Sequence, residues 1–245
     1  MDSGFKKTLS LATWVTGCSA AVVEDARQLM PEIIPRSSII YNGLEAPPVL
    51  PEPIPSNPPR VLCLGRLSYE KGFDFALTAF ATAVTQFPRA RLMVAGDGPE
   101  RTALERQALQ LGIRHAVDFL GAVTPDTVPS LLNRASLVLM PSRTEGLPLV
   151  AVEAALMARP VVATRVGGLP EVVVHRHTGL LVDKEDCQGL AEAITFVLEH
   201  PQAVAHMGQA ARRRAQAVFS LARCVSAYDA LYRTLAREGS AYGPA

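Results

Sequence analysis

Short apolar runs alternate with amphipathic stretches along most of the chain. The apolar runs lie at residues 60–65, 91–96, 116–120, 137–140 and 160–164. They mostly lack an apolar–polar alternation, which is typical of strands buried on both faces of a parallel sheet. The spacing of apolar residues between them predicts helices over residues 72–86, 100–111, 125–133 and 148–158. Alternating strands and helices with short loops predict an α/β fold with a doubly wound parallel sheet.

The two ends of the chain depart from this alternation. Near the N-terminus the pattern predicts a strand, a helix and a second strand, at residues 12–17, 20–30 and 38–41. A segment with so few elements is too small to be a domain. The C-terminal part carries three successive amphipathic patterns, at residues 186–199, 202–219 and 221–237. They predict a helical C-terminal tail that follows the sheet.

A proline-rich stretch separates the N-terminal segment from the alternating part. Seven of the fourteen residues from 46 to 59 are proline. Proline fixes φ and removes a backbone donor, so neither a helix nor a sheet interior is expected there. We expect an extended, semi-rigid linker. The predicted division is therefore an N-terminal segment, this linker, a main domain and a C-terminal helix with its tail, at residues 1–45, 46–59, 60–220 and 221–245.

The composition narrows the class of protein. Of the 245 residues, 49% are hydrophobic and 19% are charged, as in globular proteins. The formal net charge is +1, so we expect no nucleic-acid partner. The four cysteines are scattered and form no Cys-x-x-Cys pair, which favours a reduced, cytoplasmic protein without a metal knuckle. No apolar run is long enough to predict a membrane-spanning helix.

The loops after the predicted strands carry the candidate chemistry, because ligands of such sheets bind outside the carboxyl ends of the strands. The first loop, residues 65–72, presents Arg66 and Lys71 immediately before a helix. Two cations beside a helix N-terminus favour a phosphate or diphosphate ligand. A solvated loop with surface salt bridges is the alternative interpretation.

Two further loops are glycine turns. Residues 96–98 read Gly-Asp-Gly, and residues 167–168 are a glycine pair that precedes Glu171. Both allow close approach of backbone to a neighbouring group, but both are equally explained as tight strand-to-helix turns. We expect Glu171 to serve a helix N-terminus.

A pair of carboxylates follows the fourth predicted strand. Glu145 lies in the loop, and Glu153 lies inside an otherwise apolar helix. A carboxylate there is costly unless neighbours donate hydrogen bonds to it, and sugar hydroxyls are suitable donors. Glu153 alone could be a partly exposed helix residue. Together with the cationic loop, the two carboxylates favour a ligand that carries both phosphate and hydroxyl groups.

In their order along the chain these stretches resemble the retaining glycosyltransferases of the GT-B fold, specifically the large family 4 group. The matching segments are Gly65-Arg66-Leu67 with Lys71-Gly72, Gly96-Asp97-Gly98-Pro99, Phe119-Leu120-Gly121, Pro141-Ser142, Glu145-Gly146-Leu147-Pro148 with Glu153, and residues 160–163, 167–171 and 178–182. The resemblance implies two Rossmann-like domains that face a cleft. Residues 60–220 resemble the nucleotide-sugar donor-binding domain, and residues 1–45 resemble the end of the acceptor domain. We therefore expect roughly the first half of a full enzyme to be missing.

The resemblance also implies an activity, namely transfer of a sugar from a nucleoside-diphosphate-sugar to an acceptor with retention of anomeric configuration, as a hexosyltransferase. Arg66 and Lys71 would hold the diphosphate, Glu145 would position the donor sugar, and Glu153 would bond the ribose hydroxyls. The base would meet the main chain near residues 119–121. The other donor-binding residues that the resemblance implies are Gly65, Gly96, Phe119, Leu120, Gly146, Leu147 and Leu149. Because the two cations replace a metal, neither a metal nor another cofactor is expected.

Two alternatives remain open. The chain could be a donor-binding module, inactive alone or completed by a separate N-terminal half that binds the acceptor. A nucleotide-sugar epimerase of the same fold is the other reading. The base, whether of UDP, GDP or another nucleotide, stays open, and so does the acceptor, which could be a sugar, a lipid or a small molecule. A lipid acceptor would add a peripheral contact at the inner membrane face.

Overall fold

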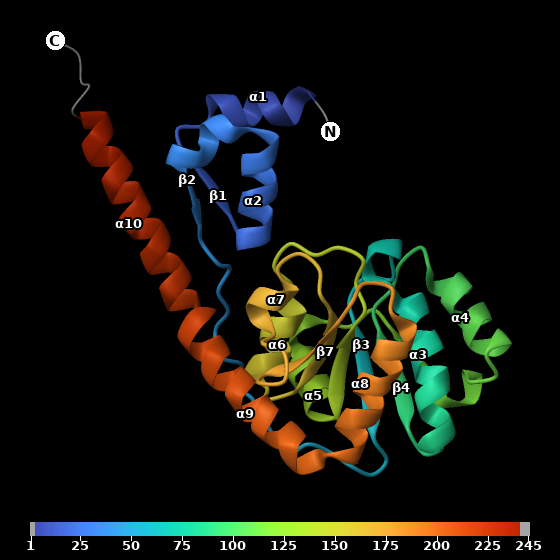
Figure 1. The fold of residues 1–245 in the computed structure, drawn as a ribbon. Coiled ribbons are helices and arrows are strands. Elements are labelled where there is room, and N and C mark those ends of the chain that lie inside the picture. Colours follow the sequence, from blue (N-terminus) through green and yellow to red (C-terminus); the bar gives the residue numbers. More distant parts are fainter. Residues whose placement is uncertain (1–2, 241–245) are drawn as a thin grey trace.

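The computed structural model describes residues 3–240 and is built around a six-stranded parallel sheet (Figure 1). Across the sheet the strands lie in the order β5, β4, β3, β6, β7 and β8. Their bounds are β3 Arg60–Leu64, β4 Arg91–Ala95, β5 Val117–Gly121, β6 Leu137–Met140, β7 Val161–Thr164 and β8 Gly179–Val182. The chain runs outward from β3 to β5 and then crosses back to β6. The strand order therefore reverses between β3 and β6, which is where such sheets bind ligands.

The expected doubly wound parallel sheet is confirmed. Each of the five strands predicted from apolar runs begins and ends within one residue of the prediction. The strands β6 and β7 are buried along their whole length, as their uninterrupted apolar sequences indicated. β8 was not predicted as a strand; it pairs with β7 at the edge of the sheet.

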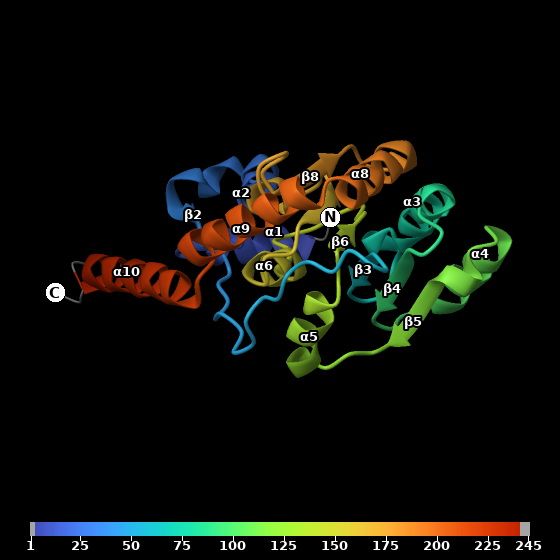
Figure 2. The ribbon, with the colours of Figure 1, turned by 90° about the horizontal axis from the view of Figure 1, so that it is seen from below.

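Helices cover both faces of the sheet. They are α3 Phe73–Gln86, α4 Arg101–Gln110, α5 Val128–Asn133, α6 Leu149–Leu156, α7 Leu169–Val172, α8 Cys187–Glu199, α9 Pro201–Val218 and α10 Leu221–Ser240. The helices α3, α4 and α8 enclose one apolar core, and α5, α6 and the second half of α9 enclose the other (Figure 2). The helix predicted at residues 125–133 instead starts with a 3-10 turn over Pro125–Thr127, which α5 continues. The three helices predicted for the C-terminal tail are confirmed.

The N-terminal segment forms a second, two-stranded parallel sheet (Figure 1). Its elements are α1 Ser3–Leu11, β1 Val15–Gly17, α2 Ala20–Leu29 and β2 Ser37–Ile39. The strand predicted from residue 12 begins only at Val15, and α1 was not predicted at all. Polar residues interrupt the apolar positions of α1, so its sequence shows no clear apolar face. In the structure Leu9 packs with Met30 and Ile33. Residues 1–2 and 241–245, the ends of the predicted first and last segments, lie outside the described residues.

The proline-rich stretch at residues 46–59 contains no helix or strand. Side chains of the sheet domain hold its backbone in place. The Asn133 side-chain amide donates to the carbonyl of Leu50 at 3.0 Å, and the Arg159 guanidinium donates to the carbonyl of Glu52 at 2.7 Å. These bonds attach the stretch to the domain at several points.

Candidate functional site

The loops that carry the predicted site residues meet at the carboxyl edge of the sheet. Close backbone packing joins them in pairs. A Cβ at Gly96, whose φ is +137°, would lie 1.9 Å from the carbonyl oxygen of Gly65, so only glycine fits between these loops. Likewise, a Cβ at Gly167 would lie 1.8 Å from the carbonyl oxygen of Glu145. The glycines thus bring the loop after β3 into contact with the loop after β4, and the loop after β6 into contact with the loop after β7.

An ion pair between Lys71 and Glu145 lies at the point where the strand order reverses. Lys71 ends a 3-10 turn over Tyr69–Lys71, and Glu145 lies in the loop between β6 and α6. The Lys71 Nζ is 2.7 Å from Glu145 Oε1, and the Ser142 hydroxyl donates to the same oxygen, also at 2.7 Å. The Glu145 side chain is only 7% exposed, whereas that of Lys71 is 29% exposed. The ammonium is therefore anchored on one side and accessible to an anion on the other.

Arg66 adds a second positive charge to the same loop. Its side chain is exposed. Among the described residues no hydrogen bond or ion pair occupies its guanidinium. A hydrogen bond from Ser68 and a backbone hydrogen bond, followed by the charges of Arg66 and Lys71, lower the pKa of neighbouring Glu70. The loop therefore presents a free guanidinium and a held ammonium to solvent.

The start of α6 borders the Lys71–Glu145 pair. The Leu147 side chain is buried in the core, so only its backbone can face a ligand. The Leu149 side chain is 38% exposed. The Gly146 carbonyl already accepts a hydrogen bond from Gly168 N at 2.9 Å. The first amides of α6 lack partners within the helix, and a helix start of this kind favours negative charge.

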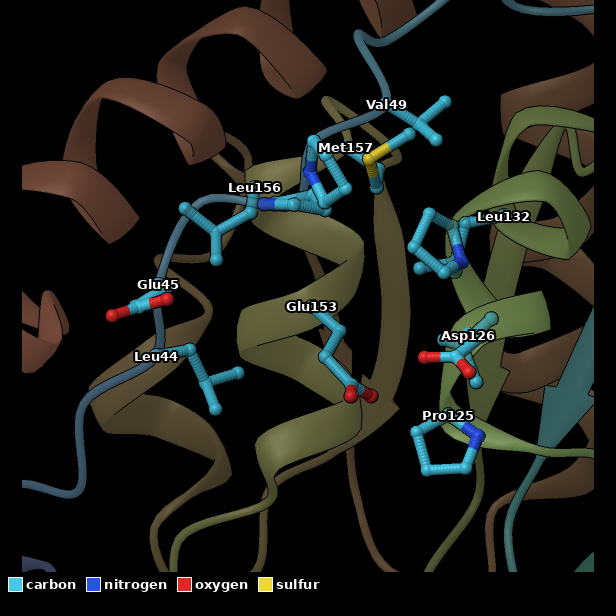
Figure 3. A pocket seen from close by; sticks show the side chains of 13 residues that line it. Leu44, Glu45, Val49, Pro125, Asp126, Leu132, Glu153, Leu156 and Met157 are labelled. Atoms are coloured by element: carbon cyan, nitrogen blue, oxygen red, sulfur yellow. The ribbon is translucent and has the colours of Figure 1, made fainter.

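Glu153 lines a cavity that neither Lys71 nor Glu145 lines. It lines a cavity of about 680 Å³, enclosed on the other sides by the chain near residues 44–49 and by residues 125–132 (Figure 3). Its carboxylate points across the cavity toward Pro125 (Figure 3). Burial raises the pKa of Glu153. No other residue predicted for the site lines this cavity, so a ligand that touches both carboxylates must extend along α6.

The predicted base-binding stretch lies at the end of β5. The Leu120 side chain is 41% exposed, and Phe119 lies beneath the Arg114 guanidinium at 5.6 Å from the ring centre. The Gly121 carbonyl accepts a hydrogen bond from Gly96 N at 2.7 Å. This bond ties the base-binding stretch to the glycine turn after β4.

Glu171 connects the N-terminal segment to the site. Its carboxylate accepts hydrogen bonds from the backbone amides of Ala20 and Ala21, at 2.8 and 3.1 Å. The helix N-terminus that it serves is thus that of α2, which lies 150 residues earlier in the chain. A Cβ at Gly146 would lie 3.6 Å from the sulfur of Cys18. The N-terminal segment therefore packs directly against the loop that carries Glu145.

The sequence interpretation missed Arg143 and assigned Ser142 no role. Ser142 binds the Glu145 carboxylate, and Arg143 crosses from the same loop to the loop of Lys71. Glu145 lies only three positions after Ser142, whereas Tyr69, a partner of Arg143, lies 74 residues away, so no local pattern marks Arg143. The assigned roles of the other site residues stay predictions.

Two kinds of feature are absent from residues 3–240. None of the helices there combines the length and the apolar character that crossing a membrane requires. No three His, Cys, Asp or Glu side chains gather in this part of the chain where they could hold a metal ion.

Known proteins resemble both the sequence and the fold. The family model for glycosyl transferases group 1 matches residues 51–214. A glycogen synthase from Mycobacterium tuberculosis is 32% identical over 217 residues, which cover 88% of this chain and 52% of that protein. A sucrose-phosphate synthase from Thermosynechococcus elongatus superimposes with a TM-score of 0.85 at 28% identity, over 96% of this chain and 61% of the other.

A structure of Anabaena HepE in complex with UDP superimposes with a TM-score of 0.78 at 25% identity, over 95% of this chain and 66% of that one. The chain spans about half the length of the mycobacterial relative. These similarities extend over the sheet and its loops and beyond them into the N-terminal segment.

Proposed function

The chain belongs to the glycosyl transferases group 1 family, and from this premise we propose that it takes part in transfer of a sugar from a nucleoside-diphosphate-sugar donor to an acceptor. The single observation that carries the proposal is the Lys71–Glu145 pair, with its 2.7 Å contact, in which Lys71 belongs to the same loop as the exposed Arg66. Two cations and a carboxylate thus lie beside the reversal of strand order, where a parallel sheet binds ligands. The UDP bound to HepE supports a nucleoside diphosphate as the ligand class.

The two cations stabilise the departing diphosphate. When the bond between the anomeric carbon and the diphosphate breaks, negative charge grows on the diphosphate oxygens. Charges that are already in position lower the energy of that state without having to reorganise. Lys71 meets this condition because Glu145, which also accepts a hydrogen bond from Ser142, holds its ammonium, and Arg66 contributes a second charge from the same loop. No metal or other cofactor enters this proposal.

The carboxylates bind the uncharged parts of the donor. Glu145 accepts hydrogen bonds from hydroxyls of the donor sugar, and Glu153 accepts them from the ribose. The cavity beside Glu153, about 680 Å³ in volume, has room for a ribose. The main chain near Phe119 and Leu120 meets the base, and Gly65 and Gly96 are further donor-binding residues. Backbone amides at Gly146, Leu147 and Leu149 complete the diphosphate site.

The proposal divides the chain by task. Residues 60–220 bind the donor, the linker at 46–59 supports them, and residues 1–45 belong to the acceptor side, with a C-terminal helix and tail at 221–245. The family 4 group and retention at the anomeric carbon are parts of the proposal that rest on the resemblance. The acceptor is a sugar, a lipid or another small molecule. Donor binding without transfer by this chain is the second candidate, because the chain spans about half of the mycobacterial relative.

Thermal unfolding with UDP, GDP, ADP and pyrophosphate tests the ligand class first. At a hundred times its dissociation constant a ligand adds about 2.7 kcal/mol, or roughly 5–10 °C for a chain of this size. A shift with one nucleoside diphosphate identifies the base. No shift with any of the four, for the folded protein, would overturn the proposal. Adding the matching nucleotide sugar and candidate acceptors then separates transfer from donor binding alone.

Calorimetry with substituted chains tests the site residues. We expect Lys71→Ala and Arg66→Ala each to weaken binding of the nucleoside diphosphate by about 1.5–3 kcal/mol, the contribution of a hydrogen bond to a charged group. Arg106→Ala is the matched control, because Arg106 is an exposed arginine on α4. Equal affinities for Arg66→Ala and the control would remove Arg66 from the diphosphate site.

A further inference from the structure

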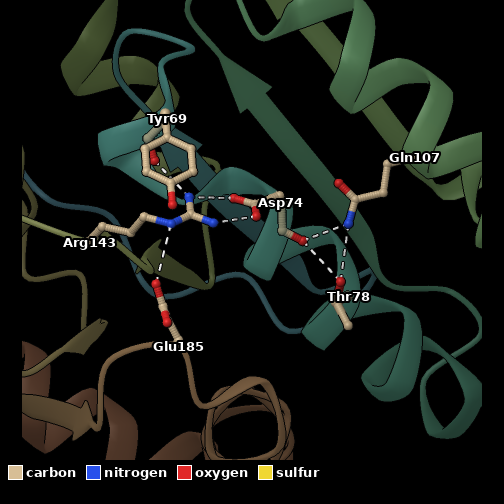
Figure 4. Close-up of polar contacts among 6 residues, drawn as sticks. All are labelled: Tyr69, Asp74, Thr78, Gln107, Arg143 and Glu185. Carbon is tan, nitrogen blue, oxygen red and sulfur yellow. Dashed lines mark hydrogen bonds and ion pairs between the residues drawn. The ribbon is translucent and has the colours of Figure 1, made fainter.

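Arg143 connects the two loops that carry the charged groups of the site (Figure 4). It belongs to the loop of Glu145, between β6 and α6. Its backbone amide donates to the carbonyl of Glu70 at 2.8 Å, and its Nη1 donates to the carbonyl of Tyr69 at 2.7 Å. Both acceptors lie in the 3-10 turn that ends at Lys71. Arg143 therefore holds the two peptide units that immediately precede the lysine.

The guanidinium of Arg143 is enclosed on nearly all sides. It lies between two aromatic rings, 3.9 Å from the centre of Tyr69 and 4.2 Å from the centre of Phe75. Its two terminal nitrogens donate to both oxygens of Asp74, at 2.9 and 2.6 Å. The side chain is only 10% exposed. A planar guanidinium can stack and form this two-point bond at once, which a lysine ammonium cannot.

The partner of Arg143 is itself held in place. Asp74 lies in the first turn of α3, and its backbone carbonyl accepts hydrogen bonds from Thr78 Oγ1 at 3.0 Å and Gln107 Nε2 at 2.9 Å. Gln107 belongs to α4, so the network reaches from the loop after β6 through α3 to a second helix (Figure 4). Glu185 adds a fourth element, with a carboxylate oxygen 3.6 Å from Arg143 Nε. Arg143 is thus fixed by groups outside the site.

These contacts lead directly to the ammonium of Lys71. A lysine side chain is long and flexible, and its entropy opposes any single position. Here Arg143 fixes the backbone that immediately precedes Lys71, and Glu145 binds the ammonium at the end of the Lys71 side chain. Arg143 and Glu145 belong to the same loop. Arg143 therefore fixes both the backbone position from which the Lys71 side chain extends and the loop that carries Glu145, the partner of Lys71.

We propose that Arg143 is a positioning residue that places the Lys71 ammonium for the donor diphosphate. It does not touch the diphosphate and acts only through the two loops that carry Lys71 and Glu145. The inference rests on the proposed function for the identity of the ligand, but not for the placement of Lys71 in the free protein. The effect of Arg143 on ligand affinity and its effect on Lys71 in the free protein are measured separately.

The first measurement is a double-mutant cycle on UDP affinity, by calorimetry. We expect Arg143→Ala to weaken UDP binding about tenfold in the native chain and less than about twofold in the Lys71→Ala chain, because coupled residues are not additive. Arg143→Lys should not restore the affinity, since it loses the stacked two-point bond. An equal loss in both backgrounds would overturn the inference, because it would show that Arg143 acts independently of Lys71.

A matched control separates positioning from general stability. Arg91 also bonds both oxygens of an aspartate, Asp118, but it lies at the opposite end of its strand from the site. Arg91→Ala should lower the unfolding temperature without changing UDP affinity. If Arg143→Ala does not fold, Asp74→Asn takes its place in the same cycle, because it removes the charged partner and keeps the stacking.

The second measurement needs no ligand. The chain contains four lysines, so the side-chain resonance of Lys71 can be identified in a lysine-labelled sample as the one missing from Lys71→Ala. In Arg143→Ala it should move toward the resonances of the exposed lysines, and in Arg91→Ala it should stay in place. An unchanged Lys71 resonance in Arg143→Ala would overturn the inference. Absence of UDP, GDP and ADP binding by the native chain would instead overturn the proposed function alone.

Discussion

Gly167 provides a quantitative test of how closely the site loops are packed. Its φ is +49°, a left-handed conformation, and a Cβ there would lie 1.8 Å from the carbonyl oxygen and 2.8 Å from the carbonyl carbon of Glu145. Gly167→Ala therefore carries two costs. The left-handed conformation costs an alanine about 1–2 kcal/mol, and forcing the two loops apart costs about 1–3 kcal/mol more. We expect the free energy of unfolding to fall by about 2–5 kcal/mol.

Gly112 separates the two costs. Its φ is +72°, and a Cβ there would meet no atom within 4 Å. Gly112→Ala should therefore lose only the conformational part, about 1–2 kcal/mol. Urea unfolding followed by circular dichroism gives both values from the midpoints, provided that the slope with urea stays the same. The difference between the two variants measures the contact between Gly167 and Glu145.

Equal destabilisation by the two substitutions would refute the reasoning, because it would show that the loops separate at no cost. The same variants also differ in their expected ligand binding. Gly167→Ala displaces the backbone of Glu145 and with it the partner of Lys71, so UDP affinity should fall. Gly112 lies at the end of α4, and its substitution should leave UDP affinity unchanged.

Two further substitutions test groups at the edge of the site. Because burial raises the pKa of Glu153, the folded protein keeps this proton to higher pH than the unfolded chain does. The free energy of unfolding should therefore fall as the pH rises from the pKa of Glu153 in the unfolded chain to its higher pKa in the folded protein. Glu153→Gln should unfold at a higher temperature than the native chain at pH 8 but not at pH 4, and parallel pH profiles would contradict this assignment. Glu171→Ala removes the acceptor for Ala20 and Ala21 and should cost about 0.5–2 kcal/mol. Amide exchange of α2 should become faster, and unchanged exchange would show that Glu171 does not hold this helix.

Local patterns were sufficient for five of the six strands of the main sheet. Strands buried on both faces need continuous apolar runs, so the five runs marked their strands to within one residue. The same reasoning failed for α1, whose polar residues hide its apolar face until Leu9 packs against Met30 and Ile33. It also missed β8, which lies at the sheet edge and follows a turn rather than a helix. Elements with weak local patterns, such as α1 and β8, form because they pack against residues from other parts of the chain.

The candidate site divides in the same way. Arg66, Lys71, Glu145 and Glu153 could be chosen from the sequence, because charged residues in loops after buried strands, or within an apolar helix, need a reason to be there. Which of these residues lie close together in space could not be predicted from the sequence. The structure pairs Lys71 with Glu145 and places Glu153 on a separate cavity, since the pairing depends on β3 lying beside β6.

The sequence by itself determined the class of fold, the order of the strands β3 to β7 and of the helices between them, and the loops that carry charge and glycine. The tertiary structure alone decided which loops are neighbours. Only it showed that Arg143 holds the loop of Lys71 and that Glu171 binds the start of α2. The physical reason is the sequence separation over which each kind of interaction acts. Periodicity and turn chemistry act between residues a few positions apart, whereas these contacts join residues 74 and 150 positions apart, which only the tertiary fold brings together.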